Sequence, residues 1–177
     1  EDLPPLAALA GRFGVELNVE GNPFAPPRAG YPGLLALCAQ VRPAQVTLVP
    51  DGDGQLTSDH GFALPGQLAA LAPLVGRLRA TGTRVSIFVD AGCTALAGAA
   101  AIGVERVEIY TGPFAEAVAG GDPGAALAAC RRTADAALYR AKHEGRNTWA
   151  FYAREMNVAT FERLVLESQL RKAIGSG

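Results

Sequence analysis

The sequence predicts an α/β fold built from parallel β/α units, and two observations support this prediction. Short runs rich in β-branched and apolar residues begin at 17, 45, 84 and 106, and each is followed by a longer segment with helical periodicity. These starts lie 22 to 39 residues apart, which leaves room for one crossover helix each time. A closed barrel of this kind needs eight units and about 250 residues. With 177 residues and four or five units, the chain is predicted to form part of a barrel or an open sheet.

The predicted elements alternate along the chain. In order, they are a helix over 3–13, strands over 17–21 and 45–50 with a helix over 32–42 between them, a polar Gly-rich loop over 51–61, a helix over 65–82, a strand over 84–90, a helix over 93–103, a strand over 106–112 and a long helix over 123–145. Pro32 suits the start of its helix and Gly82 suits a C-terminal cap. Leu68, Leu71, Val75 and Leu78 give the helix over 65–82 one apolar side.

The composition changes after Gly145. A brief aromatic strand is expected over 148–152, and a helix with one charged face over 156–174. We expect 1–132 to form the partial barrel and 133–177 a C-terminal extension. The terminal Gly-Ser-Gly is consistent with a linker, a tag or a natural turn.

Composition argues against several classes of function. The net charge of −1 gives no reason to expect nucleic acid or an anionic membrane as a partner. Three cysteines lie far apart, without CxxC spacing or a Cys/His cluster, so neither a disulfide framework nor a metal site is indicated. There is no apolar run of the roughly 20 residues that span a bilayer and no signal peptide, so a cytoplasmic location is expected.

Candidate site residues gather where the predicted strands end, because parallel β/α folds bind ligands at the carboxyl ends of their strands. These residues are Glu20, Asn22, Asp51, Thr57, Ser58, Asp90, Glu108, Thr111 and Gly112. Glu20 and Glu108 interrupt apolar strands. A partly buried carboxylate there would have a raised pKa and would suit proton transfer. A carboxylate paired with an arginine or with backbone donors remains the alternative.

The loop over 51–61 has two interpretations. Thr57 and Ser58 could hold a phosphate or a polar substrate with their hydroxyls and the backbone amides, or they could cap local backbone groups in a turn. His60 is expected to be solvated. Cys38, Cys93 and Cys130 fall on predicted helices and are expected to be small core residues.

Three blocks of the sequence resemble the pyridoxine 5′-phosphate synthase family. They are LNVEGNPFAPPRAGYPGLLALCAQVRPAQVTLVPDGDGQLTSDHGF, RVSIFVDAG and RVEIYTGPFAEA, within residues 3–137. The resemblance implies a homo-oligomeric TIM barrel. It also implies a transferase of vitamin B6 biosynthesis that condenses 1-deoxy-D-xylulose 5-phosphate with 3-amino-2-oxopropyl phosphate, two phosphorylated small molecules, without a cofactor or a metal.

The same resemblance assigns roles to three residues. Glu20 in LNVEG matches the family's proton acceptor, Thr57 in QLTSDHG matches the threonine that binds the aminoketone substrate, and Glu108 in VEIYTG matches the glutamate that stabilises the transition state. The family's NxDH, HLRxDRRH and NAGHxL motifs and its Gly-His phosphate site have no counterpart in the sequence. The resemblance therefore implies strands three to six of eight and an impaired activity for this chain alone.

A second resemblance begins near Thr133. ADAALYRAKHEGRNTWAFY is similar to the end of a GGDEF diguanylate cyclase domain, and Lys142 and Arg146 match its phosphate-contacting basic pair. The GGDEF signature and its metal-binding carboxylates are absent, and ordinary solvated helix charge is the alternative for both residues. The chain is then either an impaired synthase with a GGDEF-like tail, joined naturally or artificially, or a non-catalytic fragment of a cyclic-di-GMP signalling protein or an association module.

Overall fold

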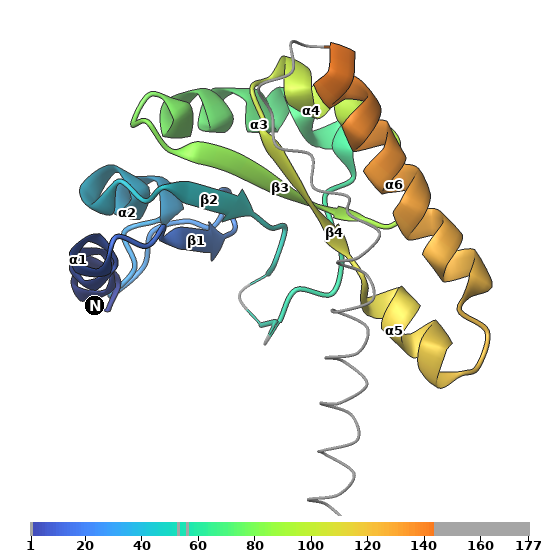
Figure 1. Cartoon of the computed structure of the whole chain (residues 1–177). Helices are drawn as coiled ribbons and strands as arrows, with labels where there is room; N and C mark the ends of the chain where they lie inside the picture. The colour runs from blue at the N-terminus through green and yellow to red at the C-terminus, as the bar shows by residue number, and fades with distance from the viewer. Residues whose placement is uncertain (1, 53, 56, 144–177) are drawn as a thin grey trace, which may run out of the picture.

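The computed structural model describes residues 2–52, 54–55 and 57–143, and four parallel strands form the sheet there (Figure 1). Strands β1 (Asn18–Gly21), β2 (Gln45–Leu48), β3 (Arg84–Asp90) and β4 (Arg106–Tyr110) lie side by side in chain order. All three pairings are parallel, which confirms the predicted β/α arrangement.

The strand register separates an apolar face of the sheet from a mixed polar face. Val19 pairs with Val46 and Val46 with Val85, so these valines share one face. Glu20 pairs with Thr47 and Thr47 with Ser86, on the opposite face. Alternation of side chains along each strand therefore sends the apolar residues toward the helices and leaves the polar residues on the other side.

Most of the helices form a row in which neighbouring helices contact one another. They are α1 (Leu3–Phe13), α2 (Leu34–Val41), α3 (Leu64–Arg79), α4 (Leu96–Ala101), α5 (Gly112–Ala119) and α6 (Gly124–His143). Contacts join α1 to α2, α2 to α3, α3 to α4 and α4 to α6, while α6 also touches β4 and α5. This order follows the strand order, as consecutive β/α units require (Figure 1).

The core lies between α2, α3 and α4 and the apolar face of the sheet. Leu71, Val75 and Leu78 of α3 are buried there, and Leu68 packs against them, as the apolar side of the predicted helix indicated. Burying a leucine or valine side chain stabilises a fold by about 1.5–3 kcal/mol, so this layer is a main source of stability. In α1, by contrast, Leu6, Leu9 and Phe13 are exposed.

Three predictions need correction. Helix α3 ends at Arg79 with Ala80 as its C-cap, and Gly82 follows with φ of 83°, so the left-handed glycine ends the turn after the helix and does not cap it. Cys93 lies in the turn before α4. The prediction missed α5, a short helix after β4 that has Pro113 near its start and buries none of its residues.

The expected strand over 148–152 and helix over 156–174 lie outside the described residues. Helix α6 runs without interruption through the predicted boundary at 132 and 133. Thr133 is fully buried, and its Oγ1 accepts a hydrogen bond from the Gly92 backbone N–H (N–Oγ1 2.8 Å). The first turns of the predicted extension are thus packed on the α/β layer.

Candidate active site at the carboxyl ends of the strands

Glu20 and Glu108 lie on the same face of the sheet. Arg106 pairs with Ser86, which lies in the row of Thr47 and Glu20, and Glu108 follows Arg106 by two residues. Both glutamates are exposed, whereas the sequence predicted that they are partly buried. The reason is their position, because β1 and β4 are the outer strands of the sheet and each has a neighbouring strand on one side only in the described structure.

The loop from β2 to α3 is fixed to the end of β3. The Phe62 backbone N–H donates to the Phe88 carbonyl (2.9 Å), and the Gly61 N–H donates to Asp90 Oδ1 (2.7 Å). A Cβ atom on Gly61 would clash with the backbone of Val89 and Asp90, so only glycine allows this close approach. Asp90 thus has a structural role for the loop.

The start of the same loop is fixed to the end of β1. The side-chain amide of Asn22 donates to the Asp51 carbonyl (Nδ2–O 2.8 Å), and the Val49 N–H donates to the Gly21 carbonyl (3.1 Å). Two strand ends therefore position the loop, one at each side of the polar residues that it carries.

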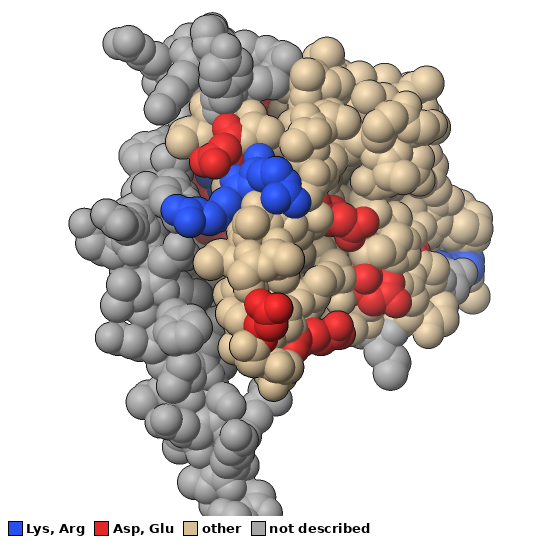
Figure 2. Space-filling view, turned by 90° about the vertical axis from the view of Figure 1, so that its right-hand side faces the viewer, with Lys and Arg blue, Asp and Glu red and all other residues tan. Residues whose placement is uncertain are grey.

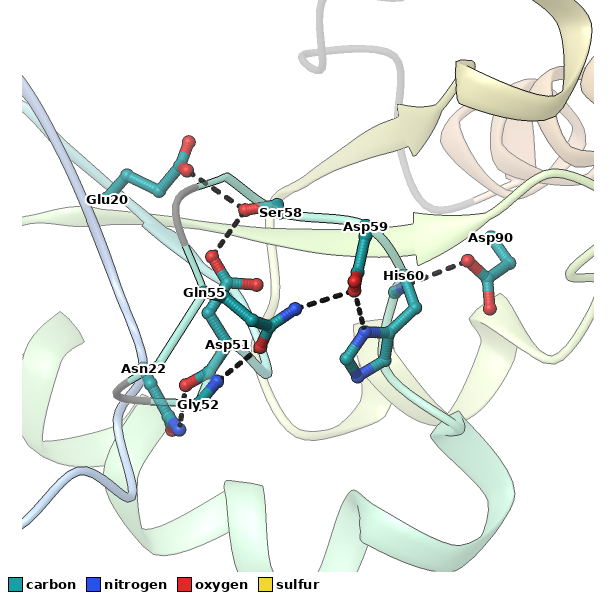
Figure 3. A network of polar contacts seen from close by, with 10 residues as sticks. Glu20, Asn22, Asp51, Gly52, Gln55, Ser58, Asp59, His60 and Asp90 are labelled. Atoms are coloured by element: carbon teal, nitrogen blue, oxygen red, sulfur yellow. Dashed lines mark hydrogen bonds and ion pairs between the residues drawn. The ribbon is translucent and has the colours of Figure 1, made fainter. Parts of the chain in front are cut away.

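Ser58 lies between two carboxylates (Figure 3). Its Oγ is 2.6 Å from Asp51 Oδ2 and 3.4 Å from Glu20 Oε1. The other oxygen of Asp51, Oδ1, is buried and has no hydrogen-bond partner among the described residues. Ser58 thereby links a residue of the loop to the glutamate on β1.

The pKa of the Glu20 carboxyl is raised above its ordinary value. Partial loss of water around the carboxyl is the largest cause, the negative charge of Glu108 is the second, and Asp51 adds a smaller effect in the same direction, whereas a hydrogen bond donated by Ser58 to Glu20 would act in the opposite direction. Although the residue as a whole is exposed, its carboxyl end thus has the raised pKa predicted from the sequence. A raised pKa favours proton uptake by this carboxylate.

A second chain of polar contacts lies farther along the loop (Figure 3). Gln55 Nε2 donates to Asp59 Oδ1 (2.6 Å), and the same oxygen contacts His60 Nδ1 (2.6 Å). The hydrogen bond with Asp59 is the main cause of a raised pKa for the His60 imidazole. His60 is half exposed, as predicted, but it is paired and not simply solvated.

The remaining predicted site residues differ in their placement. Thr57 is exposed and adjacent to Ser58 in the loop. Lys142 belongs to the last turn of α6, and Arg146 lies outside the described residues. The link between Ser58, Asp51 and Glu20 was not predicted, because sequence spacing gives no sign of a contact across 38 residues.

On the face shown in Figure 2, acidic and basic side chains occur in small separate groups. Within the described part of the chain, no group of three or more His, Cys, Asp or Glu residues is placed to hold a metal ion. No described helix is both long and apolar enough to cross a membrane. Burial raises the pKa of the Cys38 thiol to about 11, so this cysteine is a core residue.

The fold and the site define a class: a parallel β/α protein with its acidic and hydroxyl residues collected at strand carboxyl ends, as in barrel enzymes. The family model described as pyridoxal phosphate biosynthesis protein PdxJ matches residues 2–143. The chain belongs to this family. The match extends past residue 132, where the sequence predicted a change of domain.

Three of the relatives are pyridoxine 5′-phosphate synthases. The protein of Xanthomonas oryzae pv. oryzae strain PXO99A is 61% identical over 127 residues, covering 72% of this chain and 50% of the relative. That of Xanthomonas campestris pv. campestris strain B100 is 62% identical over 117 residues (66% and 46%), and that of Xylella fastidiosa strain M23 is 59% identical over 116 residues (66% and 45%). The chain spans about half the length of these relatives.

Proposed function

We propose that this chain supplies strands three to six of a pyridoxine 5′-phosphate synthase barrel, which condenses 1-deoxy-D-xylulose 5-phosphate with 3-amino-2-oxopropyl phosphate. One observation carries the proposal: Glu20 and Glu108 project from one face of the sheet, and the charge of Glu108 contributes to the raised pKa of Glu20. Two carboxylates in this relation provide a base with a raised pKa beside a fixed negative charge.

Within this proposal each residue has a defined task. Glu20 accepts a proton from a substrate, Glu108 stabilises positive charge that develops in the transition state, and Thr57 holds the aminoketone substrate from the exposed loop. The anchoring of both phosphates requires groups beyond the described residues, so the isolated chain is expected to have little synthase activity. The homo-oligomeric assembly that the family resemblance implies and the cytoplasmic location expected from the sequence belong to the same proposal. The GGDEF-like tail stays a prediction, because most of it lies beyond residue 143.

A chimeric barrel tests the function directly. Residues 2–143 replace the matching segment of the Xanthomonas oryzae relative, and formation of pyridoxine 5′-phosphate from both substrates is measured. The chimera is expected to be active, and Glu20→Gln to lower kcat about 10²–10⁴-fold, the usual loss for one positioned base. Glu116→Gln, which makes the same change on the exposed surface of α5, is the matched control and should leave kcat unchanged.

Two results would contradict the proposal. One is a folded chimera without synthase activity while the parent enzyme is active. The other is full activity in Glu20→Gln. For 1–177 alone, turnover comparable with the parent enzyme would show that the missing strands are not required.

A further inference from the structure

The Ser58 hydroxyl has one proton and two carboxylates within reach, so it donates to only one of them. The distance of 2.6 Å to Asp51 Oδ2 is typical of a hydroxyl that donates to an ionised carboxylate, whereas 3.4 Å to Glu20 Oε1 is at the outer limit of a hydrogen bond. Asp51 therefore accepts the hydrogen bond that the Ser58 hydroxyl donates. The oxygen of Ser58 then turns a lone pair toward Glu20.

The environment of Asp51 favours this direction. Its Oδ1 is buried without a hydrogen-bond partner in the described structure, so the Ser58 hydroxyl is the only described donor to a carboxylate that is partly withdrawn from water. Losing that donor would leave a desolvated charge unpaired, which is costly. Asp51 is also fixed through its carbonyl by Asn22, so it cannot easily turn to another donor.

We propose that Ser58 and Asp51 are positioning residues for Glu20. In this arrangement the Ser58 hydroxyl donates a hydrogen bond to Asp51. Ser58 Oγ then accepts a hydrogen bond from Glu20 once that carboxylate has taken up a proton. The proton moves from the substrate to a Glu20 oxygen, the electron pair of the broken bond stays on the substrate, and the new Glu20 O–H bond points toward Ser58. Asp51 accepts the hydrogen bond from Ser58 throughout. The catalytic meaning of the arrangement rests on the proposed function, whereas the arrangement itself does not.

The charged groups around Glu20 support the same direction. Glu108 on β4 and Asp51 in the loop both face it with negative charge. A Glu20 carboxylate that met a lone pair of Ser58 would add a further repulsion, so the protonated form gains most from this geometry. The direction in which removal of the Ser58 hydroxyl shifts the pKa of Glu20 distinguishes the two possible directions of the hydrogen bond. If Ser58 accepts from protonated Glu20, its removal lowers the pKa of Glu20, and if Ser58 donates to ionised Glu20, its removal raises that pKa.

The test is a carboxyl ¹³C NMR titration of Glu20 in the full chain of 177 residues, with the signal assigned from Glu20→Gln. We expect Ser58→Ala to move the titration midpoint of Glu20 to lower pH by roughly half a pH unit, the effect of one hydrogen bond on a carboxyl. Ser58→Thr keeps the hydroxyl and should keep the midpoint. In an Asp51→Asn background the hydroxyl is free to turn to Glu20, so adding Ser58→Ala should now raise the midpoint.

Asp59→Asn serves as the charge control, because it removes a carboxylate of the same loop that contacts Gln55 and His60 but not Ser58. It should leave the Glu20 midpoint nearly unchanged. A rise of the midpoint in Ser58→Ala, or no change, overturns the proposal. If alanine disturbs the backbone signals of the loop, Ser58→Cys replaces the hydroxyl with a thiol of similar size that is a weaker acceptor. The Glu20 midpoint should then also move to lower pH.

Activity provides a separate measurement. In the chimeric barrel, Ser58→Ala is expected to lower kcat more than it changes KM and to shift the acidic limb of the pH profile to lower pH. Absence of synthase activity in the unmodified chimera would contradict the proposed function and leave the NMR result standing. An active chimera with the wrong sign in the titration would contradict only the roles of Ser58 and Asp51.

Discussion

His60 and Asp59 form a charge-assisted contact in the loop between β2 and α3, with Nδ1 and Oδ1 2.6 Å apart. Because Asp59 raises the pKa of His60 in the folded chain, the pair stabilises the fold most at a pH below the ordinary histidine pKa. That contribution is lost as the pH rises through the raised pKa of the folded state. Both side chains are more than half exposed, so the pair contributes about 0.2–1 kcal/mol.

We predict that Asp59→Asn lowers the pKa of His60 toward its ordinary value. The chain contains only two histidines, so the imidazole signals are easily assigned and followed by NMR between about pH 5 and 9. This range extends to both sides of the ordinary histidine pKa of about 6.5. Asp122→Asn removes an exposed charge elsewhere and is the control. An unchanged His60 titration in Asp59→Asn would mean that the contact does not form in solution.

At the scale of single residues, the sequence indicates charged residues better than their contacts. Glu20 and Glu108 were found because a carboxylate within an apolar strand is unusual. The sequence alone predicts that Ser58 holds a phosphate or caps a turn, and its place beside Glu20 depends on how the loop folds back over the strand ends. That path is set by contacts of Gly61 with β3 and of Asn22 with the loop backbone, which no local pattern predicts.

The regular elements were predicted where their residues alternate or repeat strongly. All four strands and the helices α1, α2, α3, α4 and α6 match predicted segments. Helix α5 was missed because it has only eight residues and begins with Gly112 and Pro113, a pair that is also typical of a turn. The end of α3 was misplaced because a left-handed glycine can follow a helix at more than one distance.

We predict that Gly61→Ala lowers the free energy of unfolding by about 1–3 kcal/mol, the cost of forcing a side chain into a packed site. The new methyl group would push the loop away from the end of β3, because its nearest neighbours are backbone atoms of Val89 and Asp90. Gly76→Ala is the matched control. Gly76 lies within α3 and is exposed, and a Cβ atom added there would meet no packed neighbour, so alanine should stabilise the chain by about 0.5–1 kcal/mol.

Urea unfolding followed by circular dichroism measures both variants. The loop contact also holds Ser58 near Glu20, so Gly61→Ala should move the Glu20 titration as well as the unfolding midpoint. Equal stability of Gly61→Ala and the unchanged chain would show that the loop is not held against β3 as described.

At the scale of the whole molecule, the sheet of the described residues has two outer strands. Strands β1 and β4 each pair on one side only within the described residues, and the chain spans about half the length of its relatives. From the number of β/α units the sequence predicts part of a barrel, and this stays a prediction. What the sequence could not predict is which surface completes the sheet, because backbone donors and acceptors at a strand edge pair with any compatible strand.

We therefore predict that the isolated chain self-associates. Unpaired N–H and C=O groups of β1 and β4 favour pairing with another copy, and the exposed Leu6, Leu9 and Phe13 of α1 add an apolar surface that favours association. Light scattering should give a mass above the 18.3 kDa of one chain, rising with concentration. The chimeric barrel supplies the missing strands, so its mass should depend less on concentration. A single species of 18.3 kDa at every concentration tested would contradict the prediction and would mean that the strand edges are covered within one chain.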